Sequence, residues 1–211
     1  MLATKSVVVL APHTDDGEFG CGGTIAKFVE EGKNVHYVAF SICETSVPKD
    51  FPPDILAIEV SQATRVLDIA PQNLIVQRYP VREFPRYRQE ILDELIELRK
   101  TLKPDLVFLP STEDIHQDHQ VISQEGIRAF KHTTILGYEM PWNNLRFASA
   151  AFIPLERRHV DKKIEAVIEY KSQQHRIYTQ LDFINSLAQV RGVQAGCDYA
   201  EAFEVIRWII R

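Results

Sequence analysis

The sequence predicts an α/β protein built as three layers, with a doubly wound, Rossmann-like, mainly parallel sheet covered by helices on both faces. Over the first 130 residues, short apolar runs alternate with longer stretches of helical periodicity. Strand–helix alternation implies right-handed βαβ crossovers and hence parallel strands. The apolar runs are also continuous rather than alternating, which is typical of strands covered on both faces.

Each expected strand is a short apolar run bounded by polar residues, Gly or Pro. The first is rich in β-branched residues and ends before a polar, glycine-rich segment. A strand of this kind lies in the interior of a sheet. The expected strands are Ser6–Ala11, Val35–Ser41, Leu74–Gln77, Leu106–Leu109, Ile135–Tyr138 and Ala148–Ile153.

The expected helices carry apolar residues three and four positions apart. Ile25, Phe28 and Val29 form one apolar face, and Gly32 is a stop signal. Pro104 similarly follows the end of the third helix. The expected helices are Gly22–Glu31, Ile55–Leu67, Tyr87–Leu102, Gln117–Phe130 and Val160–His175.

Composition excludes several classes of protein. The chain has 211 residues, 45% of them hydrophobic, and 24 basic against 29 acidic residues give a formal charge of −5. These values exclude collagen-like, disordered and disulfide-dense chains, and the length suits a single domain over residues 1–211. The acidic balance argues against a nucleic-acid partner.

Neither a membrane partner nor export is expected. No run approaches the roughly 18 apolar residues of a membrane span, and the first apolar run is too short for an export signal. Cys21, Cys43 and Cys197 fit neither a disulfide framework nor a cysteine zinc pattern. We therefore expect a cytoplasmic protein with reduced thiols.

A first polar cluster, His13 to Thr24, follows the first strand. It contains His13, Asp15 and Asp16, and four of the chain's nine glycines lie between positions 17 and 23. Adjacent buried carboxylates are costly unless paired, and a cation such as zinc, which accepts imidazole and carboxylate ligands, would remove that cost. A nucleotide loop is an alternative, although the Gly-x-Gly-x-x-Gly spacing is absent. A purely structural role, with helix capping by an Asp, is another.

A second polar cluster follows the strand Leu106–Leu109 and contains His116, Asp118 and His119. Two histidines three residues apart are common on exposed helix faces. Here, however, they follow a strand, as the first cluster does. Ligands of doubly wound sheets bind at the carboxyl ends of strands, so the two clusters together indicate a metal or catalytic site.

The two clusters resemble the motifs of the PIG-L/LmbE-like family of zinc-dependent N-acetylglucosaminyl de-N-acetylases. The first motif stands here as His13-Thr14-Asp15-Asp16-Gly17-Glu18, followed by Gly22-Gly23-Thr24, and the second as His116-Gln117-Asp118-His119. Tyr170–Gln173 and Arg191–Phe203 also resemble family segments. Thr14 departs from the usual small apolar residue, and the acidic residue at Glu18 follows one branch of the family.

The resemblance implies that zinc, or another divalent metal, is held by His13, Asp16 and His119, with a fourth position for water. Asp15 would be the general base. A protonated His116, braced by Asp118, would stabilise the oxyanion. The implied reaction removes an N-acetyl group from a small-molecule sugar conjugate and releases acetate and an amine.

Substrate residues are harder to identify. Arg82 lies in a Pro-framed loop and could bind a carboxylate or phosphate. Glu44 could bond sugar hydroxyls, and Tyr199 is a candidate oxyanion donor. Trp142 could stack on a sugar ring, whereas Trp208 is better explained by core or oligomer packing. An inactive carbohydrate-binding or scaffold protein, a nucleotide-binding enzyme and a homo-oligomer remain open alternatives.

Overall fold

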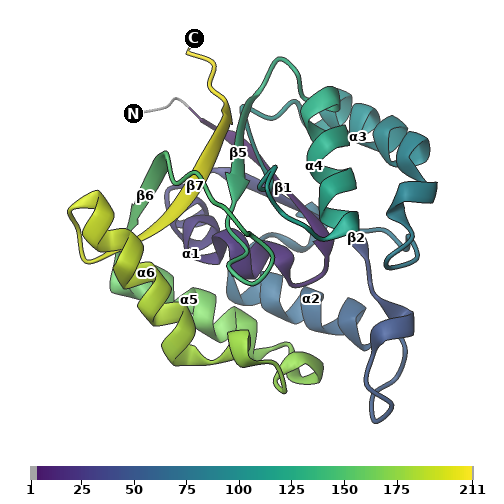
Figure 1. Ribbon diagram of the computed structural model, residues 1–211, viewed down its shortest axis with the longest axis horizontal. Helices are drawn as coiled ribbons and strands as arrows, with labels where there is room; N and C mark the ends of the chain where they lie inside the picture. Colours follow the sequence, from purple (N-terminus) through teal and green to yellow (C-terminus); the bar gives the residue numbers. More distant parts are fainter. Residues whose placement is uncertain (1–3, 211) are drawn as a thin grey trace.

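The computed structural model describes residues 4–210, which contain a seven-stranded sheet in the order β3-β2-β1-β4-β5-β7-β6 (Figure 1). The five strands from β3 to β5 run parallel, and β7 is antiparallel to both β5 and β6. The predicted mainly parallel, Rossmann-like sheet is confirmed. The strands are β1 (Ser6–His13), β2 (Asn34–Ser41), β3 (Leu74–Val76), β4 (Leu106–Pro110), β5 (Thr134–Tyr138), β6 (Ala151–Leu155) and β7 (Tyr199–Arg207).

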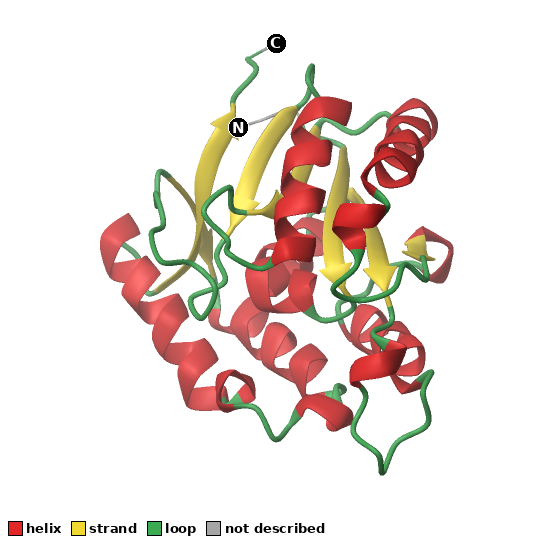
Figure 2. Cartoon of the chain, turned by 45° about the vertical axis from the view of Figure 1, so that its right-hand side comes forward, coloured by secondary structure: helices red, strands yellow, loops and turns green. Residues whose placement is uncertain are grey.

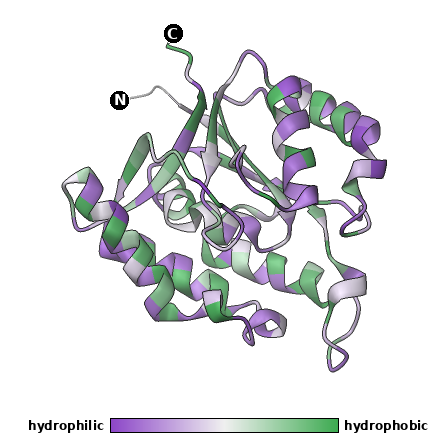
Figure 3. Cartoon of the chain, in the orientation of Figure 1, coloured by the Kyte–Doolittle hydropathy of each residue, from purple (hydrophilic) through white to green (hydrophobic). Residues whose placement is uncertain are grey.

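Helices cover both faces of the sheet, as Figure 2 shows. One face carries α1, α2, α5 and α6, and the other carries α3 and α4. Their amphipathic character is visible as alternating colours in Figure 3. The helices are α1 (Asp16–Glu30), α2 (Ile55–Val66), α3 (Arg88–Leu102), α4 (Gln117–Ala129), α5 (Arg157–Ile168) and α6 (Leu181–Ala195).

The central strands are buried on both sides because alternate side chains enter two separate cores. On β1, Val7 and Val9 pack towards α1 and α2, whereas Val8 and Leu10 pack towards α3 and α4. All four side chains are at most 1% exposed. Burial on both faces explains the continuous apolar run in the sequence.

Four elements differ from the sequence-based expectation. Helix α1 begins at Asp16 rather than Gly22, and α5 ends at Ile168 rather than His175. Helix α6 and strand β7 were not predicted. Because β7 lies between β5 and β6, the segments Thr134–Tyr138 and Ala151–Leu155 are not neighbours in the sheet.

The topology brings the two polar clusters together. From β1 the chain proceeds outwards through β2 to β3, and after β4 it proceeds in the other direction to β5. Strands β1 and β4 are therefore the neighbours at which the strand order reverses, where ligands bind in doubly wound sheets. The predicted clusters follow these two strands.

Cys21, Cys43 and Cys197 are free thiols; the first two are buried and Cys197 is half-buried. Among residues 4–210, no helix is both long and apolar enough to cross a membrane.

Candidate metal and active site

The first cluster lies in a sharp connection between β1 and α1. β1 ends at His13, and α1 begins three residues later at Asp16. A Cβ at Gly17 would lie 2.4 Å from the ring of Tyr37, and one at Gly20 would lie 2.3 Å from the ring of Tyr138. These glycines therefore allow the first turns of α1 to pack directly on the sheet.

Buried hydrogen bonds hold the Thr14 carbonyl at the centre of this connection. The hydroxyls of Tyr37 and Tyr170 each lie 2.7 Å from the Thr14 carbonyl oxygen and also contact the Glu18 carboxyl group. Burial raises the pKa of Glu18 to about 8. Glu18, which matches the family motif, thus supports the backbone beside Asp15 from within the protein.

Helix α1 is broken at Cys21, whose φ of −150° is not helical. A buried ion pair satisfies the backbone groups at this break. The Lys163 ammonium donates to the Phe19 carbonyl oxygen and to Glu201, each at 2.7 Å. The Glu201 carboxylate accepts the N–H groups of Gly23 and Thr24 at 3.1 and 2.7 Å.

The second cluster lies at the N-terminus of α4. His116 is the N-cap, and its Nδ1 accepts the Asp118 N–H at 3.2 Å. His119 lies in the first turn and is 2% exposed. The preceding loop contains Asp114, whose carboxylate accepts the backbone N–H of His116 at 2.8 Å.

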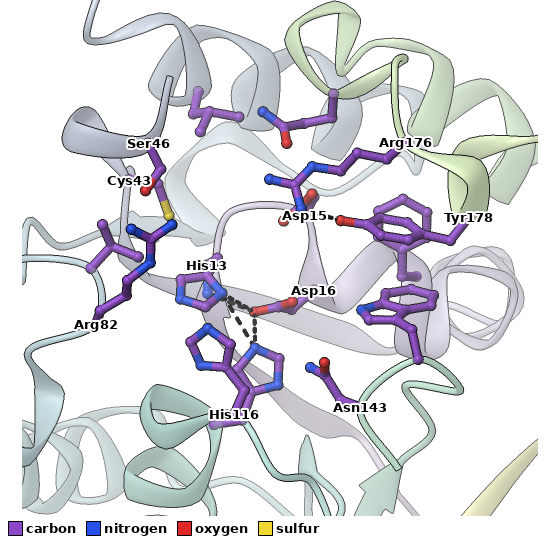
Figure 4. A pocket seen from close by; sticks show the side chains of 16 residues that line it. His13, Asp15, Asp16, Cys43, Ser46, Arg82, His116, Asn143, Arg176 and Tyr178 are labelled. Atoms are coloured by element: carbon purple, nitrogen blue, oxygen red, sulfur yellow. Dashed lines mark hydrogen bonds and ion pairs between the residues drawn. The ribbon is translucent and has the colours of Figure 1, made fainter. Parts of the chain in front are cut away.

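Three potential ligand atoms meet between the two clusters (Figure 4). His13 Nδ1 lies 3.1 Å from Asp16 Oδ2, His119 Nε2 lies 3.2 Å from the same oxygen, and the two nitrogens are 3.3 Å apart. The two histidines are 106 residues apart in the chain. The ligand set predicted from the sequence is therefore brought together in the structure.

The outer nitrogens of both imidazoles face buried carboxylates. His13 Nε2 lies 3.1 Å from Asp118 Oδ2, and His119 Nδ1 lies 2.8 Å from Asp114 Oδ2. Both carboxylate side chains are fully buried. Such contacts orient the rings of metal-binding histidines and raise their basicity.

His116 is the third imidazole of the cluster. Ligand atoms of His13, His116 and His119 lie within 4.8 Å of one another, so this trio could also hold a metal ion. Asp16 is the alternative third ligand, because its Oδ2 lies within 3.2 Å of both other ligand atoms. The His116 Nδ1 is occupied as the helix cap.

The charges at the site perturb its pKa values strongly. Burial opposes protonation of His13 and His119, but the charge of Asp16 and carboxylate hydrogen bonds raise their pKa values to about 9 and about 10. Burial opposes ionisation of Asp16, yet His119 and His13 hold its pKa well below the usual range. The site thus strongly attracts positive charge.

Asp15 lies beside this triangle and lines the same pocket. Burial and the neighbouring charge of Asp16 raise the pKa of Asp15 to about 6, while His13 and Arg176 act in the opposite direction. A carboxyl group that titrates close to neutrality is suited to accept and release a proton.

The pocket has a volume of about 200 Å³ and one aromatic wall. Trp142 stacks on Tyr178 with ring centres 4.0 Å apart and an interplanar angle of 11°. Phe19 meets both rings edge-on. Trp142, suggested by the sequence to stack on a sugar ring, thus lines the pocket, whereas Trp208 follows the end of β7 and is 46% exposed.

Arg82 also lines the pocket, on the side opposite Arg176 (Figure 4). Its backbone has a positive φ of 67°, which is unfavourable for a residue other than glycine. The Asp118 carboxylate accepts the Arg82 N–H at 2.6 Å and so holds this conformation. Backbone strain of this kind is common at functional sites.

Four of the predicted site residues make contacts other than those that the sequence suggested. Glu44 is exposed, forms an ion pair with Arg78 and is not among the pocket-lining residues. Tyr199, at the start of β7, has its hydroxyl 3.4 Å from Arg157 and is likewise not a lining residue. The other two residues are His116 and Asp118.

Asp118 braces His13 instead of His116. His116 was expected to be protonated, but burial and the charges of His13 and His119 lower its pKa to about 4. Its Nδ1 accepts a backbone hydrogen bond, which requires an unprotonated nitrogen at that position.

Sequence reasoning missed several lining or supporting residues. Asp114 lies five positions before His119, a separation that no motif of the second cluster suggested. Gln173, Arg176 and Tyr178 come from the segment after α5, which approaches the site only in the folded chain. The family-like segment Tyr170–Gln173 was the one available signal for this wall.

Comparison with known proteins decides the family. A family model described as PIG-L, GlcNAc-PI de-N-acetylase, matches residues 8–130, which include both clusters. The chain belongs to the PIG-L family. A relative from Escherichia coli K12, described as the uncharacterized deacetylase YaiS, is 24% identical over 175 residues, covering 80% of this chain and 91% of the relative.

Solved structures share the whole fold of this PIG-L family member. N,N'-diacetylchitobiose deacetylase from Pyrococcus horikoshii matches with a TM-score of 0.79 and 22% identity, over 97% of this chain and 84% of that one. GalB, the 4-carboxy-2-hydroxymuconate hydratase of Pseudomonas putida KT2440, has the same TM-score with 20% identity over 98% of each chain. One fold thus supports two reactions.

Proposed function

We propose that this protein is a metal-dependent hydrolase that removes the acetyl group from an N-acetylated sugar or sugar conjugate, with His13, Asp16 and His119 as ligands of zinc or another divalent metal. The observation that carries the proposal is the close triangle of two imidazole nitrogens and one carboxylate oxygen. Membership of the PIG-L family supports the reaction. We also propose that residues 1–211 form one domain.

The donor set fits a catalytic zinc site. Tetrahedral ligands at the usual Zn–N and Zn–O lengths are separated by about 3.3 Å, and the three observed separations are 3.1, 3.2 and 3.3 Å. Three protein ligands leave a further position open, as catalytic zinc sites require. The carboxylates of Asp114 and Asp118 supply the supporting contacts that such histidines need.

A bound divalent metal supplies acidification of water and polarisation of the amide carbonyl. In the proposed reaction Asp15 accepts the proton of the attacking water. The same carboxyl group then delivers that proton to the departing amine. One water proton thus reaches the amine nitrogen through Asp15, and the other leaves on acetic acid, which ionises to acetate at neutral pH, so the step balances.

His116 faces the same space in a neutral form. Because its Nδ1 accepts the Asp118 N–H, the ring proton of the neutral form is on Nε2. We propose that this N–H donates to the carbonyl oxygen as negative charge develops on it. A neutral donor can act in this way without the protonation that the sequence suggested.

The pocket is suited to a small molecule. Its aromatic wall offers a stacking surface, and Asn143 and Gln173 add amide groups able to bond hydroxyls. These features support a sugar ring and give no support for a nucleic-acid partner.

The test is acetate release from a panel of N-acetylhexosamine conjugates, because a hydratase of this fold would release none. Asp15→Asn is expected to retain bound metal while losing at least about a hundredfold in turnover, the lower range for general acid–base groups. Asp50→Asn is the matched control, since Asp50 is exposed outside the pocket. Full activity in Asp15→Asn would contradict the role of Asp15.

A further inference from the structure

The pocket is lined by charged groups of both signs. Among the described lining residues, the carboxylates Asp15 and Asp16 belong to the metal centre. Two arginines, Arg82 and Arg176, line opposite walls of the pocket, with Arg176 beside Asp15 (Figure 4). Apart from the two carboxylates and the histidines of the metal centre, the charged side chains that line the pocket are therefore basic, within a chain of net charge −5.

Neither guanidinium group is neutralised by an ion pair with a carboxylate in the part of the chain described. Arg176 donates to the neutral hydroxyl of Tyr178, and the bonds of Arg82 involve its backbone N–H and carbonyl group. By contrast, Arg78 pairs with Glu44 and Arg191 with Glu139. The two pocket arginines are thus free to bind an external anion.

Hydrogen bonds hold the backbone in place at or near both arginines. Arg82 is held in its left-handed conformation by the carboxylate that also orients His13. The segment that carries Arg176 is anchored upstream at Ser172, whose N–H and hydroxyl donate to the buried Glu59 carboxylate at 2.9 and 2.6 Å. Downstream, the Thr179 hydroxyl donates to the Arg176 carbonyl oxygen at 2.7 Å.

We propose that the substrate carries a carboxylate or phosphate group in addition to its N-acetyl group, and that Arg82 and Arg176 bind this anion from opposite walls while the acetamide lies at the metal centre. This inference rests on the proposed deacetylase function. Arginine suits the role because its planar donor set binds both oxyanions with two parallel hydrogen bonds.

The experiment compares three N-acetylglucosamine derivatives with the metal-loaded protein: the methyl glycoside, the carboxymethyl glycoside and the 1-phosphate. We expect kcat/KM for acetate release to be at least about tenfold higher for an anionic compound than for the methyl glycoside, since charge-assisted hydrogen bonds are strong. Comparing the carboxymethyl glycoside with the 1-phosphate distinguishes a preference for carboxylate from a preference for phosphate. Added salt should reduce the preference.

Two variants test the assignment. Arg176→Gln and Arg82→Gln should each remove most of the anionic preference, mainly through KM. Arg78→Gln is the matched control, because it removes the same charge nearby but its guanidinium pairs with Glu44. It should retain the preference.

The outcomes separate this inference from the proposed function. Equal hydrolysis of all three compounds would leave the deacetylase intact and overturn the anion site. Hydrolysis of none, together with no acetate from the wider conjugate panel, would overturn the proposed function and this inference with it. If Arg176→Gln slows all three compounds alike, Arg176 acts on neighbouring Asp15 rather than on substrate, and the inference is wrong.

Discussion

The Asp118 carboxylate lies 3.1 Å from His13 Nε2 although 105 residues separate them in the sequence. The same oxygen, Oδ2, accepts the backbone N–H of Arg82 at 2.6 Å. One buried carboxylate therefore joins a proposed metal ligand on β1 to a proposed substrate-binding residue in the loop before α3. Disturbing it should affect metal binding and substrate binding together.

Replacing Asp118 by Asn should weaken metal affinity about 10- to 100-fold, the usual cost of losing a supporting contact to a metal-binding histidine. KM should rise as well, because the left-handed backbone of Arg82 loses a charged acceptor. Competition with a chelator measures the affinity. Asp105→Asn is a control, since Asp105 caps the start of β1 far from the pocket. An unchanged affinity in Asp118→Asn would contradict the coupling.

Metal binding should release protons. The raised pKa values of His13 and His119, about 9 and about 10, mean that both imidazoles are protonated at pH 7.5 in the metal-free protein. Ligation requires both to be neutral. Up to two protons should therefore leave for each metal bound, and the apparent affinity should increase with pH through this range. Calorimetry in buffers of different ionisation enthalpy counts the protons, and a count of zero would contradict the ligand assignment.

The ion pair at the break in α1 should be important for stability. Lys163→Met leaves the Glu201 carboxylate buried without its cation, so the free energy of unfolding should fall by about 3–5 kcal/mol. Lys162→Met is the matched control: its ion pair with Asp68 is exposed, and its loss should cost less than about 1 kcal/mol. Urea unfolding measures both variants. If the two variants were equally stable, other groups would have to satisfy the backbone hydrogen bonds at the break in α1.

Replacing Thr14, in contrast, should increase the free energy of unfolding. Its side chain is fully buried, and its hydroxyl has no hydrogen-bond partner among the described residues. Thr14→Val keeps the shape and removes the unsatisfied group, so the free energy of unfolding should rise by about 1 kcal/mol. Thermal unfolding of the two proteins compares them. A loss of stability would indicate that the hydroxyl has a partner, such as a buried water molecule.

Strands that are marked by a local run of apolar residues could be predicted from the sequence. The strands β1, β2 and β4 consist mostly of apolar residues, and their boundaries agree with the sequence-based prediction within a few residues. The start of α1 was placed too late because Gly20, Gly22 and Gly23 lower helix propensity. At Gly20, close packing of the helix against Tyr138 outweighs the low helix propensity of glycine, because a larger side chain would clash there.

The candidate site was predictable where residues follow a strand directly. His13, Asp16 and His119 meet because β1 and β4 are neighbours. Arg176 and Tyr178 follow no strand and show no periodicity, so only tertiary packing places them in the pocket. Glu44 and Tyr199 follow or begin strands, yet the arginines Arg78 and Arg157 hold their side chains elsewhere.

The most direct test of the account is a metal titration of protein stripped by a chelator, with acetate release from an N-acetylated sugar conjugate as the signal. The stripped protein should release no acetate, and activity should rise with added zinc and saturate at one metal ion per chain. His119→Ala should show no saturation in the same concentration range. Full acetate release from metal-free protein, or equal saturation in His119→Ala, would contradict the central claim.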